Sequence, residues 1–298
     1  MKKLFVYSDK YKCDIGNHVF PMEKYELVYN KLLSDKIAVK HNFVEPEPVN
    51  EGDILLAHTK EYVDDLLNLR TTERTVFSEL PLTKQIIDSY IIMAAGTITS
   101  AHLALKNKLS LNIGGGFHHA SADKAEGFCY INDVAVSIKK LQKEKLIKKA
   151  AVVDCDLHQG NGTAKIFEND KNVFTFSIHQ ENLYPAKQKS SLDIGLDENT
   201  PDKVYIDKLK FALDKISEFK PELLLFVAGA DIYENDQLGA LKISKKGIEE
   251  RDEIIFKFAL EKKIPACAVL AGGYAFNVAD TVEIHYNTCK ILFELLNK

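Results

Sequence analysis

Short apolar runs alternate with longer amphipathic segments along almost the whole chain, and this alternation restricts the fold more than any other feature. The apolar runs are typical of buried strands and lie at 4–8, 109–113, 150–156, 173–179, 223–230 and 266–273. Helical periodicity covers 54–67, 83–106, 133–144, 202–219, 244–263 and 282–296. This order predicts an α/β fold with a mainly parallel sheet, flanked by helices on both faces.

We expect the 298 residues to form a single domain, 1–298, because neither a repeat nor a low-complexity linker interrupts the alternation. Residues 10–80 are predicted to be an N-terminal elaboration of this domain. An apolar content of 46% provides ample material for a core.

Composition argues against several classes of partner. The formal net charge is -4 and both signs are intermixed, so we expect no nucleic acid. No segment approaches the roughly 20 apolar residues of a spanning helix, and the first apolar run is too short for a signal peptide. We therefore expect no membrane span and a cytoplasmic location. The five cysteines show no CxxC pair, and Cys129 and Cys155 are expected in the core. The oligomeric state stays open.

Polar side chains follow five of the predicted strands. They are His118 with His119, the cluster that begins at Asp154, His179, Asp231 and Tyr274. Because ligands of open parallel sheets bind beyond the carboxyl ends of the strands, we expect these groups to face one crevice.

The stretch DCDLHQGNG has the pattern of a metal half-site. Residues two apart on an extended strand face the same side, so Asp156 and His158 are presented together. Asp231 follows an apolar run, where an acid needs a partner or a cation. Three ligands with an open position are typical of catalytic zinc. Asp154 lies one step deeper and is better placed to orient an imidazole.

The tandem His118 and His119 follow the glycines of GGG, where the backbone passes close to a bound group. One imidazole is predicted to act as general base and acid, and the other to stabilise charge. A phosphate-binding loop is the alternative, but neither GxGxxG nor GK[ST] is present. Tyr274 in AGGY offers a hydroxyl for a developing oxyanion.

Six motifs together resemble the zinc-dependent histone deacetylase family, which includes acetoin-utilisation proteins and acetylpolyamine amidohydrolases. They are GGGFHHA, GFCYINDVA, DCDLHQGNG, FSIH, AGADIYENDQLG and AGGY. The segment FPMEKY and the sequence HQGNG most resemble the class IV branch and its bacterial relatives. The resemblance implies an arginase/deacetylase-like fold.

The resemblance also implies roles for single residues. It makes Asp156, His158 and Asp231 the zinc ligands, with ferrous iron as the alternative metal. It makes His119 the general base and acid, His118 its electrostatic partner backed by Asp154, and Tyr274 the oxyanion donor. An acyl-lysine tunnel is implied at Gly127, Phe128, Tyr184 and Leu238. A structural potassium ion is implied at Asp154, Asp156, His158, Ser177 and Ile178.

The chain departs from the class I pattern at three places. Asn161 stands where that class has an aspartate, so we expect it to bond His119 and keep that imidazole neutral. Phe117 replaces a tryptophan before the histidine pair. Asp64 and Asp65 are the candidate carboxylates for the tunnel rim, although neither aligns well with the acid that grips a peptide backbone.

The sequence thus predicts a deacylase that removes acetyl or longer fatty acyl groups from lysine side chains of a peptide or protein, by attack of a metal-activated water. Longer chains are somewhat favoured, because the class IV branch is known for removing them. An acetylpolyamine or another acylated small amine is the alternative substrate. A binuclear manganese, arginase-like hydrolase is a remote alternative, because Gly160 and Ile232 stand where a second ion needs carboxylates. A metal-free binding module leaves the strand-end groups unexplained.

Overall fold

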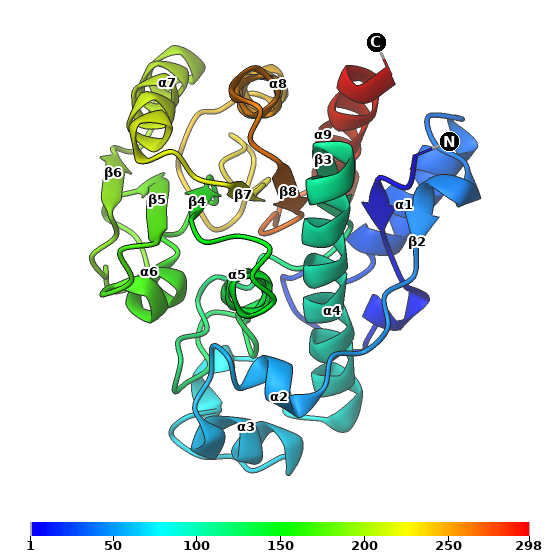
Figure 1. Cartoon of the computed structure of the whole chain (residues 1–298), viewed down its shortest axis with the longest axis vertical. Helices are drawn as coiled ribbons and strands as arrows, with labels where there is room; N and C mark the ends of the chain where they lie inside the picture. The colour runs from blue at the N-terminus through cyan, green and yellow to red at the C-terminus, as the bar shows by residue number, and fades with distance from the viewer. Residues whose placement is uncertain (1, 298) are drawn as a thin grey trace.

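Eight parallel strands form one sheet in the order β2-β1-β3-β8-β7-β4-β5-β6 in the computed structural model, which describes residues 2–297 (Figure 1). The strands are β1 (Phe5–Val6), β2 (Phe43–Val44), β3 (Leu109–Asn112), β4 (Ala150–Asp154), β5 (Val173–Gln180), β6 (Leu192–Leu196), β7 (Leu223–Val227) and β8 (Ala266–Val269). Every pairing between neighbours is parallel.

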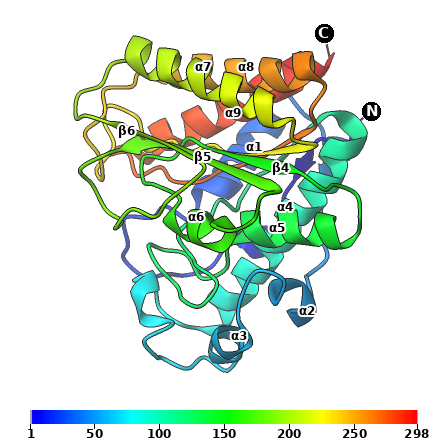
Figure 2. The same ribbon diagram turned by 60° about the vertical axis from the view of Figure 1, so that its left-hand side comes forward.

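Helices cover both faces of the sheet (Figure 2). One face carries α7 (Asp202–Phe219), α8 (Lys245–Lys262) and α9 (Val278–Asn297), with α1 (Lys24–Ser34) packed against α9. The other face carries α4 (Lys84–Asn107), α5 (Asp133–Lys143) and α6 (Asn161–Phe167). The short helices α2 (Glu51–Ile54) and α3 (Lys60–Leu67) lie against α5 and α4. Three single 3-10 turns are η1 (Asp9–Tyr11), η2 (Lys40–Asn42) and η3 (Val76–Ser78).

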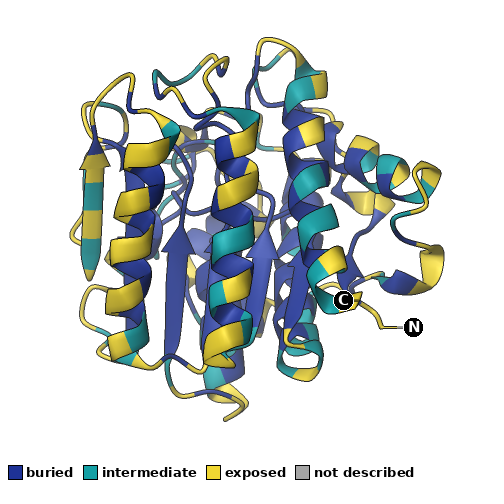
Figure 3. Ribbon diagram, turned by 90° about the horizontal axis from the view of Figure 1, so that it is seen from above, coloured by how far each residue is buried: buried dark blue, intermediate teal, exposed yellow. Residues whose placement is uncertain are grey.

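The central strands are buried along their whole length, whereas the edge strand β6 alternates between partly buried and exposed residues up to its buried last residue, Leu196 (Figure 3). Parallel strands covered on both faces need continuous apolar sequence, which is the pattern that β4 and β7 carry. All five cysteines are buried and free, so Cys129 and Cys155 belong to the core as expected.

Helix α4 corrects one expectation from the sequence. It is a 24-residue helix with a mean hydropathy of 1.2 in its most apolar window, which by length and composition alone is enough to cross a membrane. However, 72% of that window is buried inside the protein. A core helix packed against a sheet is apolar for the same reason, so its composition follows from burial.

The six predicted strands are all present. Five of them end before the predicted boundary, whereas β5 continues one residue further, to Gln180. The sequence did not reveal β2 and β6, which lie at the two edges of the sheet, or the helices α1 and α6. The predicted helix at 54–67 is interrupted, and α3 begins after the N-cap Thr59. Residues 10–80 are only partly an elaboration, because β2 extends the sheet and α1 packs on α9.

Candidate active site

The carboxyl ends of β3, β8, β7, β4 and β5 lie side by side, because these strands are neighbours in that order. The loops that follow four of them carry the predicted polar residues into one region. The exception is His179 on β5, whose Nδ1 lies 2.9 Å from the Ser177 hydroxyl and which stands outside the cluster of metal-ligating side chains. The predicted crevice is therefore built from four strand ends.

Asp156, His158 and Asp231 form a cluster in which one ligand atom of each lies within 4.8 Å of the others. The His158 Nδ1 is 3.4 Å from Asp156 Oδ1 and 3.4 Å from Asp231 Oδ2. Backbone amides fix the two carboxylates, since Leu157 N–H donates to Asp231 at 2.9 Å and Gly272 N–H donates to Asp156 at 2.9 Å. The sequence-predicted zinc ligands thus meet at one point.

The carboxylates of Asp156 and Asp231 favour a cation in this cluster. Burial lowers the pKa of His158, but Asp156 and Asp231 outweigh it and raise that pKa to about 10. Burial and the Asp156 carboxylate raise the pKa of Asp231 to about 6. Two buried carboxylates therefore draw a proton onto the imidazole between them. A divalent ion would replace that proton and neutralise both carboxylates.

Two further observations fit a metal at this position. Asp231 Oδ2 is a buried oxygen without a hydrogen-bond partner among the described residues. Gly272 also approaches the carboxylates so closely that a Cβ there would lie 2.1 Å from Asp231 Oδ2 and 2.6 Å from Asp156 Oδ2. Two carboxylate oxygens and one imidazole nitrogen are ligands that zinc accepts, so the donor set fits the predicted ion.

His118 is held by Asp154 at the end of β4. Their Nδ1 and Oδ2 atoms are 2.7 Å apart, and both side chains are buried. Burial alone would lower the pKa of His118, but the carboxylates of Asp154 and Asp156 raise it to about 9. These carboxylates thus favour the protonated form of His118.

His119 bonds a neutral partner instead. Its Nδ1 is 2.7 Å from Asn161 Oδ1, and the Asn161 amide donates to Glu126 at 3.2 Å, which directs the Asn161 oxygen toward the ring. Burial, together with the charges on His118 and His158, lowers the pKa of His119 well below its usual value. The predicted contact between His119 and Asn161 is thus present, and His119 is neutral.

A cavity of about 270 Å³ leads to these groups. It brings together the predicted tunnel residues Gly127, Phe128, Tyr184 and Leu238 with His119, His158 and Tyr274. The ring of Tyr274 packs against Phe128, with centroids 5.8 Å apart. We call this space the tunnel cavity. Two of its lining residues, Glu79 and Leu183, were not predicted from the sequence.

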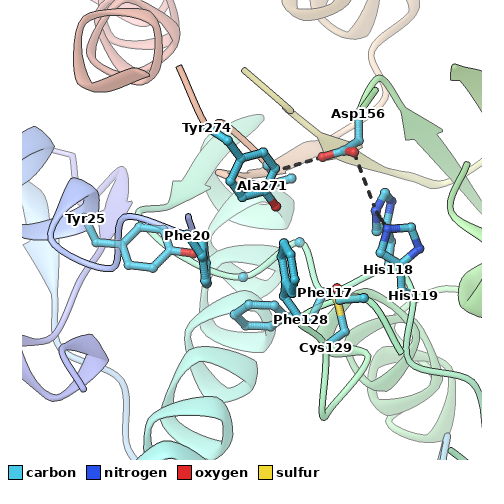
Figure 4. A pocket seen from close by; sticks show the side chains of 14 residues that line it. Phe20, Tyr25, Phe117, His118, His119, Phe128, Cys129, Asp156, Ala271 and Tyr274 are labelled. Carbon is cyan, nitrogen blue, oxygen red and sulfur yellow. Dashed lines mark hydrogen bonds and ion pairs between the residues drawn. The ribbon is translucent and has the colours of Figure 1, made fainter. Parts of the chain in front are cut away.

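A smaller cavity borders Asp156 and is shown in Figure 4. Phe20, Phe117, Phe128 and Tyr274 surround it, with Asp156 and His118 at one side. Its volume is about 20 Å³, on a scale on which a water molecule needs roughly 10–15 Å³. We call this space the inner cavity.

Lys24 is a buried cation near the ligands that sequence analysis missed. Its ammonium donates to the Ala271 carbonyl at 2.5 Å, in the loop that carries Tyr274. Burial lowers its pKa to about 8, although the carboxylates of Asp231, Asp156 and Asp236 oppose this. Its only signal in the sequence is its place in FPMEKY.

The rim carboxylates differ from those expected. Asp65 is buried and paired with Arg74 at 2.6 Å, and neither Asp64 nor Asp65 lines the tunnel cavity. The exposed Glu79 lines it instead, with a positive φ of 64°. Asp236 is a further carboxylate near this region; it is buried and accepts from the backbone N–H groups of Leu238 and Tyr274.

The five residues predicted for potassium lie on two neighbouring segments, the end of β4 with the loop after it, and β5. Ser177 is the register partner of Asp154, Ile178 follows it, and Asp156 and His158 lie just beyond the end of β4. The potassium site stays a prediction.

Comparison with known proteins gives matches over nearly the whole chain. The histone deacetylase domain model matches residues 18–289. An uncharacterized protein of Picosynechococcus is 35% identical over 94% of this chain and 95% of its own length. Histone deacetylase 2 of Arabidopsis thaliana is 32% identical over 95% of this chain and 78% of its own. The acetoin utilization protein AcuC of Staphylococcus aureus is 26% identical over 93% and 78%. The crystal structure of the HDA15 HD domain has a TM-score of 0.80 at 19% identity, covering 99% of this chain and 90% of that one, and shows the same fold.

Proposed function

The chain belongs to the histone deacetylase family, and on that premise we propose that it is a zinc-dependent amidohydrolase that removes short acyl groups from lysine side chains. The family makes it a deacetylase-type hydrolase. The choice of metal, acyl group and amine is our proposal. Ferrous iron is the alternative metal.

The observation that carries the proposal is the ligand cluster of Asp156, His158 and Asp231. The cluster holds two buried carboxylates around one imidazole, and one carboxylate oxygen lacks a partner. It is the only group of three or more metal-ligating side chains identified among residues 2–297. This supports one ion rather than the two of an arginase-like hydrolase. Zinc held there supplies a Lewis acid for an amide carbonyl and activates water.

The surrounding residues have distinct proposed tasks. The neutral His119 accepts a proton from the attacking water and returns it to the leaving amine. The charged His118, 3.1 Å away between the two Nε2 atoms, stabilises negative charge beside the reacting carbon. Tyr274, which lines both cavities, donates its hydroxyl to the developing oxyanion.

The tunnel cavity supports a thin, flexible amine substrate. Phe128, Tyr184 and Leu238 give it aromatic and aliphatic walls, which suit the methylene groups of a lysine side chain. A branched amine would have to displace these walls to reach His119.

The inner cavity supports a short acyl group, in contrast to the longer chains that the sequence favoured. Its volume of about 20 Å³ holds a group of the size of a methyl or a water molecule. A long chain would have to displace the rings of Phe20 and Phe117, which are buried in the core. We therefore expect acetyl groups to be removed faster than long fatty acyl groups.

One observation favours a second candidate substrate, an acetylated polyamine. Glu79 places a carboxylate in the lining of the tunnel cavity, where it could pair with an internal ammonium group. Lysine peptides do not need this pair. The substitution Glu79→Gln separates the two cases, because it removes the charge and keeps the shape.

A substrate panel tests the proposal. Acetyl-lysine peptides, long-chain acyl-lysine peptides, acetylspermidine and acetylputrescine are incubated with the protein, and the released acid is quantified, with Asp231→Ala as background. We expect the highest kcat/KM for acetyl-lysine peptides. A preference for acetylpolyamines that Glu79→Gln abolishes would replace the lysine substrate with the second candidate. Faster release of long-chain acids would overturn the preference for short acyl groups that we infer from the inner cavity. If no substrate releases acid, the proposed amidohydrolase activity is wrong.

A further inference from the structure

A buried ion pair lies beneath the metal ligands, on the side of the sheet covered by α8 and α9. Arg251 and Asp252 of α8 are 0% and 1% exposed. The guanidinium contacts Asp252 Oδ1 through Nε at 2.8 Å and through Nη2 at 2.7 Å. The Thr288 hydroxyl of α9 donates to the other Asp252 oxygen at 2.6 Å. The carboxylate is thereby fixed from two helices.

The third nitrogen of the guanidinium reaches the segments that carry the metal ligands. Arg251 Nη1 donates to the Gly229 carbonyl at 2.6 Å and to the Cys155 carbonyl at 3.3 Å. Cys155 directly precedes Asp156, and Gly229 lies two residues before Asp231. One side chain thus joins the extensions of β4 and β7 just before their ligands.

Arg251 supplies hydrogen-bond donors just beyond the end of the ladder between β4 and β7. The Cys155 N–H still donates to Val227 in the ladder between β4 and β7 at 3.1 Å. Beyond that bond the ladder between β4 and β7 ends, although the segment after β7 still bonds the segment after β8 through the N–H groups of Ala228 and Ala230. The carbonyls of Cys155 and Gly229 accept from Arg251 instead. A buried carbonyl needs such a donor. Arg251 therefore extends the link between β4 and β7 into the loops that carry Asp156 and Asp231.

A shift of these two carbonyls would move the carboxylates of Asp156 and Asp231 directly, because the same loops carry them. A Cβ on Gly229 would lie 2.6 Å from the Asp156 Cα and 2.7 Å from Asp231 Oδ1. No side chain therefore stands between the Gly229 backbone and the two ligands. A displacement of Gly229 changes their spacing, because there is no intervening atom to absorb it.

Stability alone does not account for an ion pair at this position. Burying two charges costs several kcal/mol per ion, and apolar residues of similar volume often replace such pairs without loss. The pair at Arg251 and Asp252 also does not add net charge near the ligands. Its distinctive property is geometric, because a planar guanidinium held on one edge presents its remaining N–H groups in a fixed direction.

We propose that Arg251 is a positioning residue that holds the backbone of Asp156 and Asp231 at the spacing a metal ion requires, with Asp252 and Thr288 fixing its orientation. The inference rests on the metal site of the proposed function. It assigns Arg251 no contact with substrate. The tunnel cavity does not include Arg251, so substrate binding should not depend on it directly.

Zinc affinity, measured by competition with a chelator on the folded protein, tests this role. Arg251→Met should weaken zinc binding about 10- to 100-fold, the usual effect of losing a residue that supports a ligand. At saturating zinc, kcat should fall and KM for an acetyl-lysine peptide should stay unchanged. Arg251→Lys, which retains a charge and a donor, should recover part of the affinity.

Two further variants separate positioning from stability. Ile255→Ala, in the same helix and equally buried, loosens the packing of α8 without touching either carbonyl. The double variant Arg251→Met with Asp252→Leu removes the uncompensated charge and should regain much of the melting temperature lost by Arg251→Met. The Thr288 hydroxyl also donates to the Ile284 carbonyl at 3.1 Å, so it should keep a partner when Asp252 is replaced. Zinc affinity should remain low in the double variant, because the carbonyls still lack their donor.

The outcomes are distinct even where Arg251→Met does not fold. A double variant that binds zinc as tightly as Ile255→Ala would overturn the positioning role while leaving the proposed function intact. Wild-type protein that binds no divalent metal would overturn both proposals. Weak zinc binding in the double variant, with near wild-type affinity in Ile255→Ala, is the result that we expect.

Discussion

His118 and His119 are neighbours in the chain, and their surroundings give the two imidazoles opposite acid–base behaviour. Each is at most 5% exposed, and each places Nδ1 2.7 Å from a side-chain oxygen. The oxygen belongs to the carboxylate of Asp154 in one pair and to the amide of Asn161 in the other. The chemical type of the partner is therefore the main difference between the two pairs.

That difference decides where the proton lies. Burial lowers the pKa of both rings, but the carboxylates beside His118 reverse the effect and raise its pKa to about 9. The pKa of His119 stays well below its usual value, because the amide of Asn161 cannot match the effect of burial and of the neighbouring positive charges. Two adjacent histidines thus become a cation and a neutral base.

The largest effect is expected when the neutral base is removed. His119→Gln keeps a polar side chain but cannot accept the proton, so kcat should fall about 10²- to 10⁴-fold. Zinc content should be unchanged. His58→Gln is the matched control, since His58 is also buried and bonded through both nitrogens, to Ser121 and Asn132. Near wild-type turnover in His119→Gln would contradict the assignment of His119 as the base.

A smaller effect is expected when the first pair is converted into a copy of the second. Asp154→Asn removes the charge that opposes burial, so the pKa of His118 should fall from about 9 and the ring should become neutral at physiological pH. We expect a 10- to 100-fold loss in kcat/KM. Titration of the ring by NMR measures the pKa. A ring that stays charged would show that Asp154 does not set its protonation.

The smallest effect is expected when the second pair is converted into a copy of the first. In wild type the base form of His119 dominates above its low pKa. Asn161→Asp should raise that pKa and move the acidic limb of the pH–rate profile upward by about one unit. The nearby Glu126 opposes a second carboxylate, so the shift should be larger when Glu126→Gln is added. An unmoved limb in the double variant would contradict the contact between the two side chains.

The pairs also show how far the sequence alone could lead. The contact between His119 and Asn161 was predicted from family resemblance, and the cluster of Asp156, His158 and Asp231 from strand spacing together with that resemblance. Central strands such as β4 were visible because burial on both faces demands an apolar run. The edge strand β6 was not, because only the last residue of LDIGL is buried and the others alternate between partly buried and exposed positions.

The local sequence around the other candidate functional residues did not indicate a role for them. Lys24, Glu79 and Arg251 lie in separate helices and loops, and their surroundings arise only when those elements pack. An arginine in an amphipathic helix is expected at the surface, yet Arg251 is buried because Asp252 and two carbonyls accept from it. Pairings of this kind depend on tertiary structure, so periodicity does not predict them.

The acid–base contrast has a function only if a metal ion stands between the ligands, and parallel purification of wild type and Asp231→Ala tests this most directly. Zinc and iron content and deacetylase turnover are measured on both proteins, with the exposed Asp207→Ala as control. We predict one divalent ion per chain and turnover in wild type and in the control, and neither in Asp231→Ala, because two ligands do not hold zinc against water. Full metal content in Asp231→Ala, or turnover by metal-free protein, would contradict the account.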